Sequence, residues 1–146
     1  MLELTERDEM PDMDYLVVRE LHQMGVQLAI DDFGTGQSSL SYLERLHPNV
    51  LKIDKTFTAA IGTDAVNSTV TDIIIALGKR LKIALVAEGV ETEQQEGYLR
   101  RHGVAVLQGY LYAKPMPIAD FPRWLAGDLP PPAAKKDQPM SALTLR

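Results

Sequence analysis

The segment Asp31-Asp32-Phe33-Gly34-Thr35-Gly36 follows directly on an apolar run, Val26 to Ile30, that is typical of a buried strand. Two adjacent carboxylates at a strand end repel each other unless they share a cation or a proton. The two glycines allow a sharp turn and a close approach to a ligand, and Ser38 or Ser39 can cap a following helix. The alternative is an ordinary strand-to-helix turn in which the helix dipole favours the acids. For the pair followed by Gly-Thr-Gly, we favour a ligand site with a divalent metal.

The overall composition is that of one globular domain. The chain has 146 residues, 45% of them hydrophobic, and a formal net charge of −5. This charge argues against binding to a nucleic acid polymer. The chain has no cysteine, which excludes disulfides and fits a cytoplasmic location. Its apolar runs are too short to cross a membrane, so we expect no membrane association.

Apolar periodicity predicts alternating strands and helices. Strands are expected to start at residues 2, 26, 50, 83 and 104, and helices are expected over about 13–24, 39–46, 64–81, 92–102 and 118–125. The last helix should bury Phe121 and Trp124. This alternation is typical of βα units and predicts an α/β fold with a parallel sheet. Residues 1–127 then form the domain, and the proline-rich residues 128–146 form a disordered tail.

Polar residues stand at or near the carboxyl end of each predicted strand. They are Glu3, Asp31, Asp54, Glu88 and Gln108, with Lys52 one residue before the end of its strand. Parallel strands share one end, where ligands bind in folds of this kind. Any single acid there could simply cap a helix or lie in a solvated loop. Together they predict a site for a hard cation such as Mg²⁺ or Mn²⁺.

Five motifs carry a resemblance to a known family. They are Glu3-Leu4-Thr5-Glu6, the segment from Asp31 to Gly36, Lys52-Ile53-Asp54, Ala87-Glu88-Gly89-Val90-Glu91 and Gln108-Gly109-Tyr110. In this order and spacing, over about residues 1 to 125, the chain resembles the EAL domain of bacterial cyclic-di-GMP phosphodiesterases. The resemblance implies a TIM-like (β/α) barrel, of which this chain carries about five of the eight parallel strands.

The resemblance also implies an activity, the metal-dependent hydrolysis of cyclic di-GMP to linear pGpG with two Mg²⁺ or Mn²⁺ ions. Glu3 and Asp31 resemble ligands of the first metal, and Asp31 and Asp32 serve the second. Lys52 resembles the residue that positions or activates the attacking water. Paired metals suit this chemistry because they stabilise both the attacking and the leaving oxygen.

Four further residues take supporting roles by the same resemblance. Glu88 resembles a ligand or an orienting acid, and Gln108 resembles a residue that holds the water or a metal-bound group. Glu6 and Glu91 resemble supports for the loop after Asp32.

The chain also departs from the family pattern. It lacks the Glu-Ala-Leu motif and an Asn on the next strand, which supply further metal ligands in the family. Gln37 stands where an aromatic residue is usual. We therefore expect a truncated domain with impaired catalysis, and whether the chain is an enzyme is left open. The open edges of an unclosed barrel would favour a homo-oligomer.

Two other functions remain as alternatives. One is a non-catalytic EAL remnant that binds a nucleotide or a protein partner. The other is a phosphoacceptor receiver domain, which also has an acidic pair, a later aspartate such as Asp54 and a Lys-Pro pair such as Lys114-Pro115. A receiver domain would place its acidic pair after the first strand. Here the pair follows the second predicted strand, because a strand and a helix come before it. This order favours the EAL interpretation.

Overall fold

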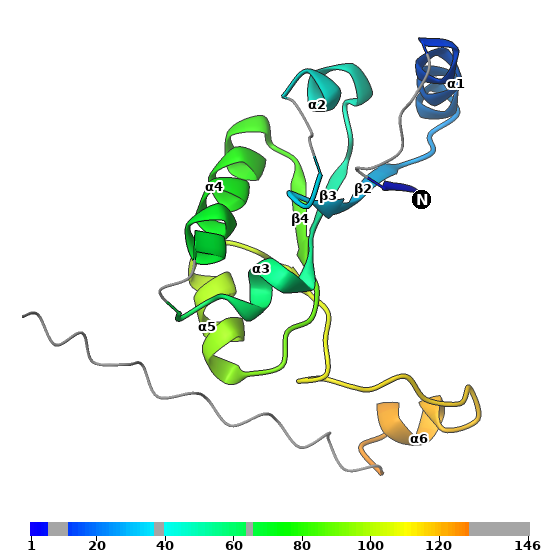
Figure 1. The fold of residues 1–146 in the computed structure, drawn as a ribbon. Helices are drawn as coiled ribbons and strands as arrows, with labels where there is room; N and C mark the ends of the chain where they lie inside the picture. Colours follow the sequence, from blue (N-terminus) through cyan, green and yellow to red (C-terminus); the bar gives the residue numbers. More distant parts are fainter. Residues whose placement is uncertain (6–11, 37–39, 64–65, 129–146) are drawn as a thin grey trace, which may run out of the picture.

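Five parallel strands form a single sheet in the part of the chain that the computed structural model describes, residues 1–5, 12–36, 40–63 and 66–128. The strands pair in sequence order and are Leu2–Thr5 (β1), Leu28–Phe33 (β2), Val50–Ile53 (β3), Ala84–Ala87 (β4) and Val106–Leu107 (β5). Figure 1 shows the sheet at the centre of the molecule. The predicted α/β fold with a parallel sheet is confirmed.

Each strand is followed by one or two helices. They are Asp12–Gln23 (α1), Leu40–Leu46 (α2), Lys55–Ala59 (α3), Val66–Leu81 (α4), Glu93–Arg101 (α5) and Phe121–Leu125 (α6). The sequence did not predict α3, because it is only five residues long and two of these are threonines, which are weak helix formers. None of the described helices combines the length and the apolar character needed to cross a bilayer.

The hydrophobic core lies against one face of the sheet, here called the outer face. Leu4, Ile30, Leu51 and Leu85 form a row in register across four strands, and the last three of these are buried. Helices α1, α2, α4 and α5 pack onto this row through Val18, Leu43, Leu46, Ile74, Ile75 and Leu99. Burial of these apolar side chains is the main force that holds the helices on the sheet.

The opposite face of the sheet, here called the inner face, is different. Side chains alternate between the two faces of a strand, so Lys52 lies on the inner face although its neighbour Leu51 belongs to the core. Its register partners on the next strands are Val86 and then Val106. Val106 is 53% exposed. The inner face therefore combines open apolar positions with charged ones.

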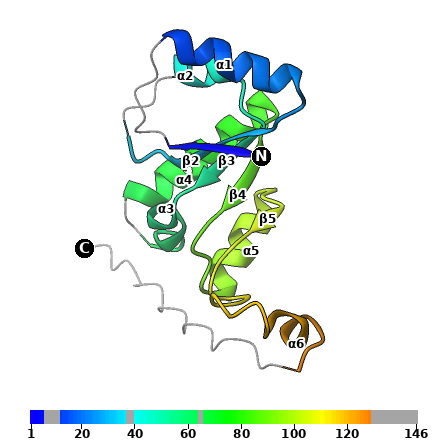
Figure 2. The same ribbon diagram turned by 90° about the vertical axis from the view of Figure 1, so that its right-hand side faces the viewer.

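The expected burial of Phe121 and Trp124 was wrong, because Phe121 is exposed and Trp124 is only half-buried. No residue of α6 is buried, and Phe121 is 45% exposed. The two rings instead stack on each other, with their centroids 5.9 Å apart. Figures 1 and 2 both place α6 away from the sheet. The apolar spacing correctly predicted a helix in this region. A short helix, however, needs a packing partner before its apolar side can be buried.

Several expectations fall outside the described residues. They concern the caps Ser38, Ser39 and Asp64, the support residue Glu6, the atypical Gln37 and the tail beyond Asp128.

Candidate functional site

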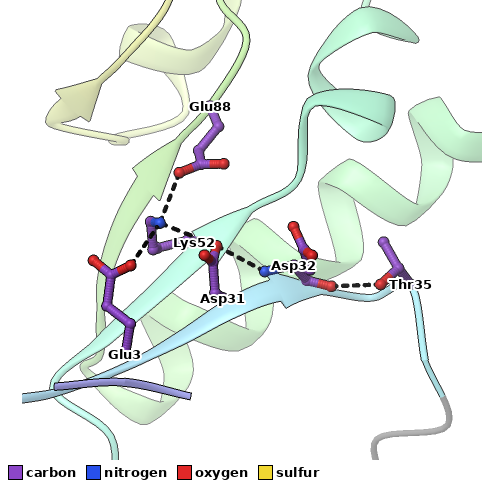
Figure 3. Close-up of polar contacts among 6 residues, drawn as sticks. All are labelled: Glu3, Asp31, Asp32, Thr35, Lys52 and Glu88. Atoms are coloured by element: carbon purple, nitrogen blue, oxygen red, sulfur yellow. Dashed lines mark hydrogen bonds and ion pairs between the residues drawn. The ribbon is translucent and has the colours of Figure 1, made fainter. Parts of the chain in front are cut away.

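A lysine joins three carboxylates at the carboxyl end of the sheet. The Lys52 Nζ atom lies 2.8 Å from Glu88 Oε1, 3.0 Å from Asp31 Oδ1 and 3.2 Å from Glu3 Oε2. Figure 3 shows these side chains pointing toward one another, three of them from strands and Glu88 from the segment after β4. The acidic cluster, defined as Glu3, Asp31, Asp32 and Glu88, is thus assembled from residues that are far apart in the sequence. The convergence expected from their positions at strand ends is confirmed for these residues and Lys52.

An irregularity in β2 brings its two aspartates into the same cluster. The strand continues past Ile30, where we expected it to end, to Phe33, and its register with β3 shifts between these two residues. In a regular strand Asp31 and Asp32 would point to opposite faces. Here Asp32 has a left-handed φ of 53°, a conformation that aspartate tolerates better than most residues. The Asp31 Oδ1 atom accepts a hydrogen bond from the Asp32 N–H at 2.9 Å.

The turn after Asp32 is held by Thr35, a residue that the sequence analysis did not single out. Its N–H and its hydroxyl both donate to the Asp32 carbonyl oxygen, at 3.2 and 2.9 Å. Gly34 has a φ of +96°, and a Cβ there would lie 2.9 Å from the Phe57 ring of α3. Glycine is therefore required both by the backbone and by the close packing of α3. The turn and α3 together fix the position of Asp32.

Asp54 has a structural role, although its place at the end of β3 suggested a functional one. It is buried and caps α3, where its Oδ1 atom accepts hydrogen bonds from the Thr56 N–H at 2.8 Å and the Thr56 hydroxyl at 2.5 Å. Burial favours the neutral form, but hydrogen bonds from Thr56, the Lys55 backbone and Asp32 outweigh it and lower the pKa of Asp54. The Asp-x-Thr pattern after a strand could have predicted this cap.

The turns after β4 and β5 are joined through the backbone. The Gln108 N–H donates to the Ala87 carbonyl at 2.8 Å, and the Gln108 carbonyl accepts from the Val90 N–H at 3.0 Å. Gln108 is exposed, whereas Glu88 is half-buried. Gly109 has no room for a side chain, because a Cβ there would collide with the Val90 backbone. This close approach places Gln108 beside the segment that carries Glu88.

Glu91 is positioned by the start of the next helix. Its N–H donates to the Gln95 Oε1 atom at 2.8 Å. Gln95 also forms a capping box with Thr92 at the amino end of α5. The loop from Glu88 to α5 is therefore ordered by hydrogen bonds on both sides of Glu91.

Lys52 carries its charge despite being largely shielded from solvent. Its side chain is 13% exposed. Burial opposes the charged form, but hydrogen bonds to Glu88, Asp31 and Glu3 outweigh it and raise the pKa of Lys52 above its ordinary value. Four carboxylates against one ammonium leave a formal charge of −3 in and around the cluster. Such an excess of negative charge favours the binding of a further cation.

Three of these carboxylates fit a metal ion. Asp31, Asp32 and Glu88 each offer an oxygen atom, and the three atoms all lie within 4.8 Å of one another. Carboxylate oxygens without thiolate or imidazole are the donors that hard divalent cations prefer. The donor set is therefore suited to a hard divalent cation.

Comparison with known proteins identifies the family. The model of the EAL domain matches residues 1–115. The chain belongs to the EAL domain family. The Escherichia coli K12 protein PdeD, described as a probable cyclic di-GMP phosphodiesterase, is 73% identical to this EAL domain over 133 residues, which are 91% of this chain and 25% of PdeD. The chain thus spans about a quarter of the length of this relative.

Solved structures of EAL domains share the fold. One is the PaMucR phosphodiesterase in complex with c-di-GMP, with a TM-score of 0.74 and 45% identity over 82% of this chain and 49% of that one. Another is Klebsiella pneumoniae BlrP1 in a complex with manganese and cyclic di-GMP, with a TM-score of 0.70 and 34% identity over 77% of this chain and 29% of BlrP1. The parallel sheet found here is therefore part of a TIM-barrel-like fold.

Proposed function

We propose that this EAL domain binds cyclic di-GMP at the carboxyl end of its sheet and contributes the greater part of a site that hydrolyses it to pGpG. The observation that carries this proposal is the convergence of Asp31, Asp32 and Glu88 on one point, with Lys52 among them. The relatives support it, because PdeD and PaMucR are described as phosphodiesterases and two related structures hold the nucleotide.

Divalent cations complete the proposed site. Asp31, Asp32 and Glu88 would hold them, with Glu3 at the same strand end and Mg²⁺ or Mn²⁺ as the candidate ions. Such ions would supply positive charge to the phosphodiester and make a nearby water more acidic. Without them, an acidic cluster would repel a substrate that carries two phosphates.

The chain's own residues take the remaining roles in the proposal. Lys52 reaches the centre of the cluster, from where it can orient the attacking water. Gln108, held beside the segment of Glu88, can donate a hydrogen bond to that water or to the substrate. Glu91 and Glu6 are assigned to the support of the loop after Asp32. The lack of cysteine fits our expectation that the protein acts in the cytoplasm.

We further propose that the 146-residue chain alone hydrolyses cyclic di-GMP very poorly. Its sequence contains no Glu-Ala-Leu motif, so the metals would have fewer ligands than in the family pattern and would be held less rigidly. Misplacement of a reacting group by a small distance costs a large factor in rate. A role in binding nucleotide without hydrolysis is the alternative that this departure favours.

The test compares the chain with a fusion. The chain is assayed with Mn²⁺ and cyclic di-GMP, and pGpG is measured by chromatography. The fusion places in front of Met1 the segment of PdeD that precedes the matched region. We expect little pGpG from the chain, clear turnover by the fusion, and loss of that turnover in a fusion carrying Asp31→Ala.

The outcomes separate the parts of the proposal. Rapid turnover by the unfused chain would contradict impaired catalysis. An inactive fusion that still binds cyclic di-GMP would favour the binding role. A folded fusion that neither binds nor hydrolyses the nucleotide would refute the proposed function.

We also propose that the chain self-associates through its sheet edges. In the described part of the chain, β1 and β5 each pair with a single neighbour, and strands with an unpaired edge tend to pair with another chain. Light scattering should show a mass that rises with concentration. Leu2→Lys, at the exposed end of β1, should reduce it, whereas Ile73→Lys, on the exposed face of α4, should not. Equal effects of the two changes would contradict the role of the edge.

A further inference from the structure

Lys52 contacts two of the three carboxylates that could hold a divalent cation. The Lys52 ammonium contacts Asp31 Oδ1 at 3.0 Å and Glu88 Oε1 at 2.8 Å, and these two residues also belong to the group that fits a metal. Figure 3 shows the ammonium between Glu3 and Glu88, with Asp31 beside it. A second cation at these carboxylates would lie close to the ammonium, and like charges at such separations repel strongly.

We propose that Lys52 is an internal counter-ion that holds the acidic cluster together without metal, and that a divalent cation must displace it from Asp31 and Glu88. The inference rests on the proposed function in one respect, the binding of a metal by this cluster. It goes beyond the assignment of Lys52 to the attacking water, because it gives the same side chain a second position and a role before the metal binds.

Two consequences follow from this competition. Without metal, the ammonium offsets the repulsion among Glu3, Asp31 and Glu88, and it therefore stabilises the carboxyl end of the sheet. With metal, displacement of the ammonium lowers the observed affinity, because part of the binding free energy is spent on breaking its ion pairs. If Lys52 only oriented the attacking water, its removal would weaken metal binding or leave the metal affinity unchanged.

The experiment compares three variants of the 146-residue chain with the wild type. Lys52→Met removes the charge and keeps the length of the stem, whereas Lys52→Arg keeps the charge. Lys79→Met is the matched control, because Lys79 is exposed in the last turn of α4, near the amino end of β4 and thus far from Glu88. Mn²⁺ affinity is measured by calorimetry, and Tm is measured in EDTA and at saturating Mn²⁺.

For Lys52→Met we expect a Kd for Mn²⁺ that is at least about tenfold lower than in the wild type. We also expect a lower Tm in EDTA and a larger rise in Tm with Mn²⁺. Lys52→Arg and Lys79→Met should both bind Mn²⁺ about as the wild type does. An unchanged or weaker affinity in Lys52→Met would overturn the proposal while leaving metal binding, and hence the proposed function, intact.

A measurement on the wild type covers the case in which Lys52→Met does not fold. The side-chain ammonium signal of Lys52 is followed by NMR during titration with Mg²⁺. We expect it to shift or disappear with the same midpoint as metal binding. A signal that stays unchanged at saturating Mg²⁺ would overturn the proposal. Failure of Mn²⁺ and Mg²⁺ to bind any form of the chain would count against the metal in the proposed function as well.

Discussion

The two faces of the sheet differ in almost every physical property, although they are built from the same strands. On β3, Leu51 is fully buried in the outer core, and the next residue, Lys52, points to the inner face and meets three carboxylates. The outer face is apolar and covered by helices, whereas the inner face carries a formal charge of −3 at its carboxyl end. Stability and chemistry are therefore separated here by a single residue step along a strand.

The largest expected effect tests the outer face. Leu51→Ala should lower the free energy of unfolding by about 3 kcal/mol, because it leaves a cavity in a packed core. Its neighbour Val50 is half-buried and lies on the inner face, so Val50→Ala should cost about 1 kcal/mol or less. Urea denaturation followed by circular dichroism measures both. Equal losses would show that the inner face contributes as much to stability as the outer one.

The second prediction concerns the inner face and its two aspartates. Asp31→Ala should weaken Mn²⁺ binding by about 100-fold, and Asp32→Ala by about tenfold. Asp31 contacts Lys52 and orients the backbone of Asp32, and the family resemblance assigns it to both metals. Calorimetry on the two variants makes the comparison. If Asp31→Ala bound Mn²⁺ as tightly as the wild type, the assignment of the metal to this cluster would be wrong.

The smallest effect tests Asp54, which lies at the carboxyl end of β3 but serves α3. Asp54→Ala should cost about 1 kcal/mol of stability at neutral pH through loss of the cap. The pKa of Asp54 is lower in the folded chain than its ordinary value of 3.8. Its charge therefore stabilises the fold above that value, and this contribution is lost as the pH falls through the lower folded pKa.

Asp54→Asn is the matched control, because asparagine caps a helix as well as aspartate but does not titrate. The difference in unfolding free energy between the wild type and Asp54→Asn should be constant near neutral pH and should shrink below about pH 4. Urea denaturation at a series of pH values measures it. If this difference in unfolding free energy instead grew as the pH fell, the charge of Asp54 would destabilise the fold.

Local patterns in the sequence were enough to predict the parallel α/β architecture and the approximate place of every strand. Apolar runs such as Val26 to Ile30 alternate with helical periodicity, and burial of these runs allows few arrangements other than a parallel sheet with helices packed on it. The order of strands also located Glu3, Asp31, Lys52 and Glu88 at one end, because parallel strands share their carboxyl end. These inferences need only local patterns and the direction of the chain.

The roles of the side chains at that end depend on tertiary contacts. The irregularity at Asp32 that brings both aspartates together depends on the pairing of β2 with β3 and on the packing of Gly34 against Phe57. Lys52 meets its three carboxylates because residues distant in the sequence come together. Phe121 is exposed because no surface of the described part of the fold faces it. The role of Asp54 as a helix cap likewise depends on its surroundings in the fold. Such pairings follow from the balance of burial, charge and backbone strain over the whole fold, which no local pattern records.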